Sequence, residues 1–108
     1  MKTISRDQLK TQLEHGHNFY LIDVLDEESF NDYHLPKAVN IPVKSDNFEE
    51  RIKDKVPKKD DEIVVYCKDK SCNASPEAAK KIEAMGYKNV YDYEEGKVDW
   101  KNANLPVQ

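Results

Sequence analysis

Short apolar runs alternate with amphipathic segments along the whole chain, and this alternation restricts the fold more than any other feature. The most apolar run is Glu62–Cys67, in which Ile63–Tyr66 are β-branched or aromatic throughout and therefore typical of a strand. Asn18–Leu25 contains a second continuous apolar run, as expected of a strand that is covered on both faces. Shorter strands are predicted at Ala38–Val43 and Asn89–Tyr93.

The amphipathic segments between these runs predict helices. Ser5 and Gln8 have the spacing of a capping box, and Ser75-Pro76-Glu77 has the composition of an N-cap, a first-turn proline and an acidic first turn. The predicted helices are Ser5–His15, Asp26–Tyr33, Phe48–Lys55 and Ser75 to about Met85, with Gly86 as a left-handed C-cap and a terminal helical turn at Val98–Asn102. Strands that alternate with helices predict an α/β domain, with a parallel or mostly parallel sheet and helices on both faces.

Composition supports one folded domain over residues 1–108, because domains typically span roughly 100–150 residues. The chain carries 17 Lys and Arg against 21 Asp and Glu, a formal net charge of −4. This balance argues against a nucleic-acid partner, since such proteins usually present a basic face. No window approaches the roughly 18 apolar residues of a membrane span, and the start, MKTISRDQLK, lacks the apolar stretch of a secretory signal. We therefore expect a cytoplasmic protein without a membrane partner.

The strongest chemical signal follows the predicted central strand. Ligands of parallel sheets bind beyond the carboxyl ends of the strands, and Cys67 ends this strand immediately before a loop that runs into a helix. Helix N-termini and nearby lysines lower the pKa of a cysteine, and orphan N–H groups of a first helical turn bind anions. Cys67 is therefore the candidate catalytic nucleophile, and its alternative is a small buried apolar side chain. We expect the loop's backbone amides to form a cradle around it, contributed by Lys68, Asp69, Lys70, Ser71, Cys72, Asn73, Ala74 and Ser75.

The other candidates in this loop have competing interpretations. Lys68 and Lys70 add positive charge to the rim of the loop, partly offset by Asp69, or are simply exposed to solvent. Cys72 is either an ordinary loop residue, a partner thiol for Cys67 or a second sulfur-accepting thiol. A zinc site needs about four ligands, and with two cysteines and no histidine close in sequence we expect no metal.

Three segments, in order, resemble the single-domain rhodanese-like proteins. LIDVLDEESFNDYHLPKAVNIP (Leu21–Pro42) is similar to the family's first signature, and IVVYC (Ile63–Cys67) resembles the strand that delivers its catalytic cysteine. SPEAAKKIEAMGYKNVYDYEEGKVDW (Ser75–Trp100) is similar to the helix after the active-site loop and to the Gly-x-x-x-Trp close. The resemblance covers nearly the whole chain and implies a central, mostly parallel five-stranded sheet with helices on both faces.

The resemblance also implies a chemistry. Rhodanese-like sulfurtransferases carry sulfane sulfur as a cysteine persulfide inside a loop of inward-facing amides. Carried over, Cys67 attacks thiosulfate, a persulfide or a polysulfide and passes the outer sulfur to a thiol or cyanide. The expected partners are a small sulfur-containing anion, a protein persulfide or a sulfur-acceptor protein, and no cofactor is implied. Asp23 matches the aspartate of the family's Asp-Val pair, which implies structural support near the loop.

The chain departs from the family pattern at the end of the loop. Ala74 stands where family loops carry an arginine, and Leu25 stands where many members have another. An arginine clamps an anion through two hydrogen bonds, so its absence predicts weak thiosulfate turnover and argues against phosphatase activity. Two further hypotheses stay open: a thiol redox protein in which Cys67 and Cys72 form a disulfide, and a non-catalytic binding or regulatory module with this fold.

Overall fold

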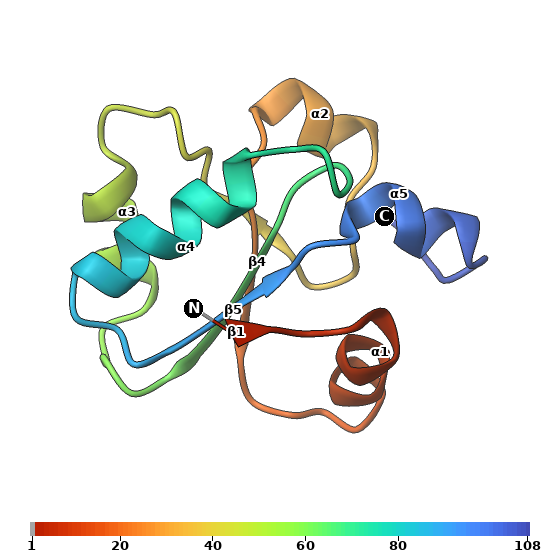
Figure 1. Ribbon diagram of the computed structural model, residues 1–108, viewed down its shortest axis with the longest axis horizontal. Coiled ribbons are helices and arrows are strands. Elements are labelled where there is room, and N and C mark those ends of the chain that lie inside the picture. Colours follow the sequence, from red (N-terminus) through yellow and green to blue (C-terminus); the bar gives the residue numbers. More distant parts are fainter. Residues whose placement is uncertain (1) are drawn as a thin grey trace.

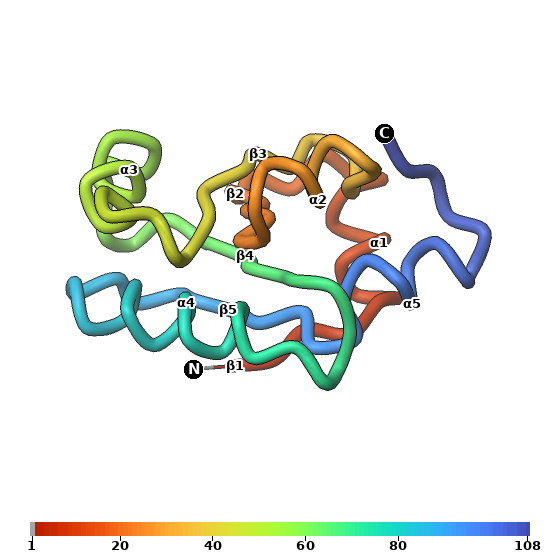
Figure 2. Tube along the Cα trace, turned by 90° about the horizontal axis from the view of Figure 1, so that it is seen from above, coloured from red at the N-terminus to blue at the C-terminus, as the bar shows by residue number. Residues whose placement is uncertain are grey.

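The computed structural model describes residues 2–108 and is built on a five-stranded sheet. Every neighbouring pair of strands is parallel, in the order β1-β5-β4-β2-β3; Figure 1 labels β1, β5 and β4, and Figure 2 labels all five strands. The α/β class, the parallel direction and the five strands that the resemblance implies are confirmed, although β1 is not among the four strands predicted from the residues, and the sheet is wholly rather than mostly parallel. The strands are β1 (Lys2–Thr3), β2 (Tyr20–Asp23), β3 (Val39–Asn40), β4 (Glu62–Tyr66) and β5 (Asn89–Tyr93).

Helices cover both faces of this sheet, as expected. Figure 2 shows α3 and α4 together on one side of the strands and α1 and α5 on the other. Within residues 2–108, none of the helices has the length and apolar character needed to cross a membrane. The helices are α1 (Arg6–Glu14), α2 (Glu27–Asp32), α3 (Phe48–Lys55), α4 (Ala74–Ala84) and α5 (Gly96–Asn102).

The two faces of the sheet bury separate apolar clusters. On one face, Phe48 and Ile52 of α3 and Ile82 of α4 pack over side chains of β2 and β4. On the other face, Leu9 of α1 and Trp100 of α5 pack against the sheet. Because each central strand has apolar neighbours on both faces, β4 is almost fully buried, which is why its sequence is an uninterrupted apolar run.

Local sequence signals placed some helix ends correctly and others not. The Ser5–Gln8 capping box is present at the start of α1, and Gly86 has a left-handed φ of 99° after α4. The predicted N-cap at Ser75 is wrong: α4 begins at Ala74 after Asn73, so Ser75 lies in the first turn. Ser75 is buried there against Cys67, and this tertiary contact decided the helix start over the local Ser-Pro pattern.

The sheet brings three loops to one edge. Asp23 of β2, Tyr66 of β4 and Tyr93 of β5 lie in register as neighbours. Since all strands are parallel, the segments that follow these residues leave the sheet on the same side. The candidate site therefore lies where the chain leaves β4, flanked by the segments after β2 and β5.

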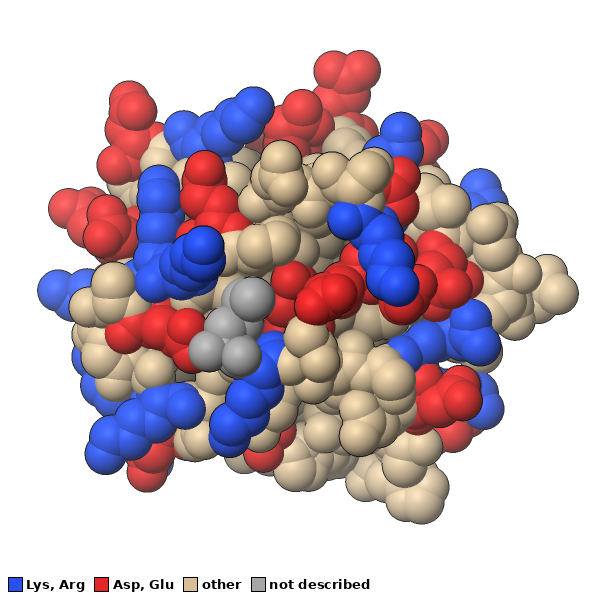
Figure 3. All heavy atoms as spheres, in the orientation of Figure 1, with Lys and Arg blue, Asp and Glu red and all other residues tan. Residues whose placement is uncertain are grey.

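Charged side chains of both signs are mixed over the face of the molecule in Figure 3.

Candidate active site

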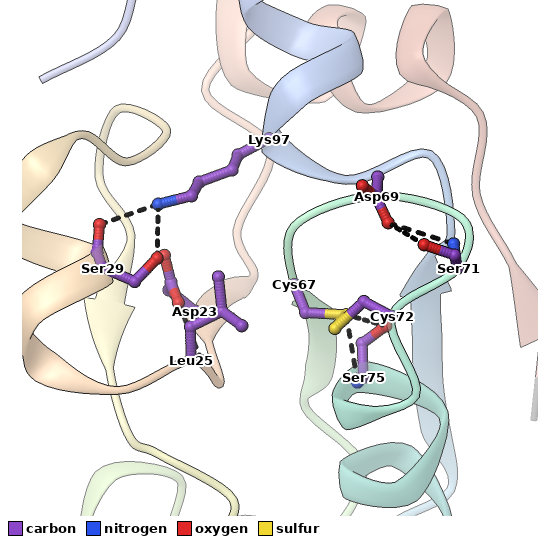
Figure 4. The surroundings of a disulfide bond; sticks show 9 residues. All are labelled: Asp23, Leu25, Ser29, Cys67, Asp69, Ser71, Cys72, Ser75 and Lys97. Carbon is purple, nitrogen blue, oxygen red and sulfur yellow. Dashed lines mark hydrogen bonds between the residues drawn. A yellow bond between two sulfur atoms is a disulfide. The ribbon is translucent and has the colours of Figure 1, made fainter.

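The loop after β4 is closed by a disulfide between Cys67 and Cys72 (Figure 4). The two Cα atoms are 6.4 Å apart, a distance within the range that disulfides span. Cys67 is 1% exposed, whereas Cys72 is partly exposed. The sequence left this pairing open as one of several roles for Cys72, and the structure contains it.

The sulfur of Cys67 rests on the first turn of α4. The N–H of Ser75 donates to Sγ of Cys67 over 3.4 Å, and the hydroxyl oxygen of Ser75 is also 3.4 Å from that sulfur. The N–H groups of a first helical turn have no acceptor within the helix and lie at its positive end, so this contact is of the kind that favours an anionic sulfur.

The rest of the loop is organised around Asp69 rather than around the sulfur. Oδ1 of Asp69 accepts hydrogen bonds from the backbone N–H (3.1 Å) and the hydroxyl (2.7 Å) of Ser71, and its carbonyl accepts from the N–H of Cys72 (3.1 Å). The hydroxyl of Ser71 holds the pKa of the Asp69 carboxyl below its usual value. In this disulfide form the N–H groups of Ser71 and Cys72 therefore donate to Asp69. Among the loop amides predicted to surround Cys67, the N–H of Ser75 is the one that donates to its sulfur in the described residues. The substrate-binding role of the loop amides stays a prediction.

The remaining predicted loop residues lie at the surface or in the helix start. Lys70 is exposed and its Nζ pairs with Glu95 over 3.4 Å, while the side chain of Lys68 is exposed to solvent. Asn73 precedes α4 without a side-chain capping bond, and Ala74 is its partly buried first residue. Both lysines are therefore exposed at the surface, and a role for them in substrate binding stays a prediction.

The start of α5 holds the backbone that leads into the loop. The N–H groups of Lys97 and Val98 donate to the carbonyls of Cys67 and Lys68, each over 3.0 Å. Gly96 has a φ of 76°, and a Cβ at this position would overlap the carbonyl of Lys68 and lie 2.7 Å from the N of Asp69. Sequence reasoning placed the last helix at Val98 and missed this support, although a glycine beside the start of a helix was the available signal.

Asp23 lies fully buried at the end of β2. Its Oδ1 accepts the N–H of Leu25 over 2.9 Å, which fixes the turn that follows the strand. Burial raises the pKa of its carboxyl, and the hydrogen bond from Leu25 offsets part of that rise. These contacts are compatible with structural support near the loop, and that role of Asp23 stays a prediction.

Lys97 is a buried lysine that the sequence did not single out. Figure 4 shows its side chain pointing away from the disulfide toward Ser29. Its Nζ donates to the carbonyl (2.7 Å) and the hydroxyl (2.9 Å) of Ser29 and to the carbonyl of Tyr33 (3.0 Å), so it links α5 to α2. Burial lowers the pKa of its ammonium. No sequence pattern marks this residue, because its burial depends on how α2 and α5 meet.

A cavity of about 340 Å³ borders Cys72. Neither arginine of the chain lines it: Arg6 pairs with Asp99 over 3.1 Å, and Arg51 donates to the carbonyl of Asn40 over 3.0 Å. No arginine from elsewhere in the chain therefore replaces, at this cavity, the loop arginine that the sequence lacks. The cavity lies between the segment after β2, the segment after β3 and the start of α4, and is lined by Val24, Leu25, Asp26, Pro42, Val43, Lys44, Cys72, Asn73, Ala74 and Glu77.

Comparison with known proteins identifies similar chains. A family model described as rhodanese-like domain matches residues 5–103. The chain is 31% identical over 106 residues to the HTH-type transcriptional regulator Rv0324 of Mycobacterium tuberculosis, covering 96% of this chain and 43% of that protein. It is 42% identical over 87 residues to the adenylyltransferase and sulfurtransferase UBA4 of Candida albicans, covering 76% of this chain and 19% of that protein.

A solved structure with a similar fold is thiosulfate sulfurtransferase from Pseudomonas aeruginosa. The TM-score is 0.87 at 26% identity, over 99% of this chain and 20% of that chain. The present chain thus spans less than half the length of the two curated relatives and a fifth of this structure.

Proposed function

This chain belongs to the rhodanese-like domain family, and from that premise we propose that it is a sulfurtransferase in which Cys67 carries sulfane sulfur as a persulfide. Two of the similar proteins described above have sulfurtransferase in their names, which supports sulfur transfer at the level of the family. The observation that carries the proposal is the position of Cys67. Its sulfur lies at the carboxyl end of a buried strand and accepts an N–H from the first turn of α4.

The proposed reaction has two displacement steps. The thiolate of Cys67 attacks the sulfane sulfur of the donor, forming a new S–S bond, and the remainder of the donor leaves; from thiosulfate this is sulfite. The acceptor, a thiol or cyanide, then attacks the outer sulfur and Cys67 leaves as a thiolate. The N–H of Ser75 and the positive end of α4 favour the anionic sulfur in both steps. A thiol on a small molecule or on an acceptor protein is the proposed destination of the sulfur.

The missing arginine bears on the choice of donor. Thiosulfate carries two negative charges. The cavity beside Cys72 is lined by one cationic side chain, that of Lys44, and by the carboxylates of Asp26 and Glu77. We therefore propose slow turnover of thiosulfate and a persulfide, which carries a single negative charge on its sulfur, as the donor that this charge balance favours, with a polysulfide as the alternative donor.

The disulfide sets a condition on this chemistry. Cys67 is bonded to Cys72 and so has no free thiolate to attack a donor. Reduction must precede sulfur transfer, which makes a thiol redox cycle of the same two cysteines the second candidate function. The two candidates differ in whether Cys72 is needed for turnover.

Paired serine variants separate the candidates. Reduced Cys67→Ser and Cys72→Ser proteins are given polysulfide or thiosulfate with cyanide as acceptor, and the thiocyanate formed beyond that of the protein-free reaction is measured. We expect Cys72→Ser to retain sulfur transfer and Cys67→Ser to lose it. Activity that survives Cys67→Ser contradicts the proposal. A fully reduced wild-type chain that turns over no donor would instead indicate a binding module with this fold.

A further inference from the structure

The two sulfurs of the disulfide differ in their surroundings. We infer that the disulfide is opened by a small thiol that enters the cavity beside Cys72 and attacks Sγ of Cys72, leaving Cys72 as a mixed disulfide and Cys67 as a free thiolate. This inference goes beyond the proposed function, because it concerns the reaction that prepares Cys67 and assigns a thiol-binding and modification site to Cys72.

Access favours attack at Cys72. Cys67 is 1% exposed and does not line the cavity of about 340 Å³, whereas Cys72 is partly exposed and does. The walls beside it come from the segment after β2 and from the first turn of α4. A cavity of this volume matches the lower end of small-molecule sites, which start at roughly 300 Å³. A small thiol therefore reaches the sulfur of Cys72 without displacing the core.

The leaving group favours the same direction. Thiol–disulfide exchange is faster when the departing thiolate is the better stabilised one. Attack at Cys72 releases Cys67, whose sulfur accepts the N–H of Ser75 over 3.4 Å at the positive end of α4. Attack at Cys67 would release Cys72, which lies in the loop before the helix and whose own N–H is bonded to the carbonyl of Asp69. Access and leaving-group stability therefore both favour attack at the sulfur of Cys72.

The exchange balances without an additional reactant. The incoming thiolate forms one S–S bond to Cys72 and breaks the S–S bond to Cys67, and the negative charge moves from the incoming thiol to Cys67. A second molecule of the same thiol then attacks the mixed disulfide, releasing Cys72 and the oxidised thiol dimer. Both cysteines end reduced, and two thiols supply the two electrons.

The lining of the cavity indicates the class of thiol. Its walls include Val24, Pro42 and Ala74, and its charged side chains are those of Asp26, Lys44 and Glu77, a net charge of −1. A small thiol with an apolar body and a cationic or neutral end fits this lining better than an anionic thiol of the same size. The expected ligand is an aminothiol.

Peptide mapping tests the direction of attack. The oxidised full-length chain is treated briefly with cysteamine and quenched with iodoacetamide, then digested with trypsin. Cleavage after Lys68 and Lys70 places the two cysteines on separate peptides. We expect cysteamine on the peptide that contains Cys72 and the carbamidomethyl group on the peptide that contains Cys67. The opposite distribution overturns the inference, and because no sulfur donor is used, that result leaves sulfur transfer by Cys67 unaffected.

A charge comparison tests the class of thiol. Rates of disulfide opening at equal thiolate concentration are compared for cysteamine and 3-mercaptopropionate, and each rate is taken relative to that of the same thiol with the uncharged 2-hydroxyethyl disulfide, because the two thiolates differ in intrinsic nucleophilicity. We expect cysteamine to be faster by about three-fold, an advantage typical of one exposed charge and reduced by salt. Glu77→Gln should lower this ratio, whereas Glu50→Gln, which removes the same charge from α3 outside the cavity, should leave it unchanged. Equal rates for the two thiols, or a faster anionic thiol, overturn the assignment of the ligand.

Discussion

Gly96 offers a direct test of how α5 supports the active-site loop. We predict that Gly96→Ala destabilises the protein and displaces the loop, because the added Cβ overlaps the carbonyl of Lys68 and lies 2.7 Å from the N of Asp69. Both contacts are with backbone atoms, which cannot rotate away as a flexible side chain would. The loop must shift, or α5 must retreat and lose its hydrogen bonds to the carbonyls of Cys67 and Lys68.

The magnitude follows from two separate costs. An alanine at a left-handed φ such as the 76° of Gly96 costs roughly 1–2 kcal/mol. Forcing an extra carbon into a packed site costs roughly 1–3 kcal/mol more. Gly16 provides a matched control, since its φ is 68° and no atom lies within 4 Å of the position of its Cβ. Gly16→Ala should therefore show the backbone cost alone.

Two assays read the two effects. Urea denaturation of the reduced proteins gives the free energy of unfolding, and the rate of Cys67 alkylation in a Cys72→Ser background reports the position of the loop. We expect Gly96→Ala to lose about 3 kcal/mol and to change the alkylation rate, while Gly16→Ala loses roughly 1–2 kcal/mol with the rate unchanged. Equal losses and equal rates in the two variants would refute the role assigned to Gly96.

Two further predictions concern buried charges. Burial raises the pKa of the Asp92 carboxyl above its ordinary value, so the ionisation of this side chain destabilises the fold at neutral pH, and this cost fades as the pH falls through the raised pKa. Asp92→Asn should therefore increase the free energy of unfolding by about 1 kcal/mol at neutral pH, and urea titrations should show this gain shrinking on acidification. Lys97→Met should lower the free energy of unfolding by roughly 2–4 kcal/mol, because it leaves buried acceptors of α2 unpaired. Lys101→Met, an exposed change in the same helix, should lower it by less than about 1 kcal/mol, and equal losses in the two variants would contradict the link from α5 to α2.

Elements with strong local patterns were predictable from the sequence. The bounds of α3 (Phe48–Lys55) and β5 (Asn89–Tyr93) agree with the prediction residue by residue. The first has an apolar pair one turn apart before a proline, and the second is a short run with valine and tyrosines, residue types that favour strands. By contrast, β1 (Lys2–Thr3) was missed because its two residues are exposed and carry no apolar pattern. This strand exists through its pairing with β5.

The site was predictable to the extent that sequence order determines it. Cys67 at the end of a buried strand was identified from the run before it, and its spacing from Cys72 permitted a disulfide without requiring one. The direction of the loop amides, the burial of Lys97 and the cavity beside Cys72 depend on how segments distant in sequence meet. Ser75 shows the difference most clearly, since its local pattern indicates an N-cap and its tertiary contact places it under the sulfur.

The mass of the reduced Cys72→Ser protein after exposure to polysulfide tests the central proposal most directly. This variant cannot form the disulfide, so a persulfide on Cys67 has no internal thiol to remove it. We predict a gain of one sulfur atom that maps to the peptide containing Cys67 and disappears when cyanide is added. A protein whose mass is unchanged, or whose added sulfur maps elsewhere, would contradict sulfur transfer through Cys67.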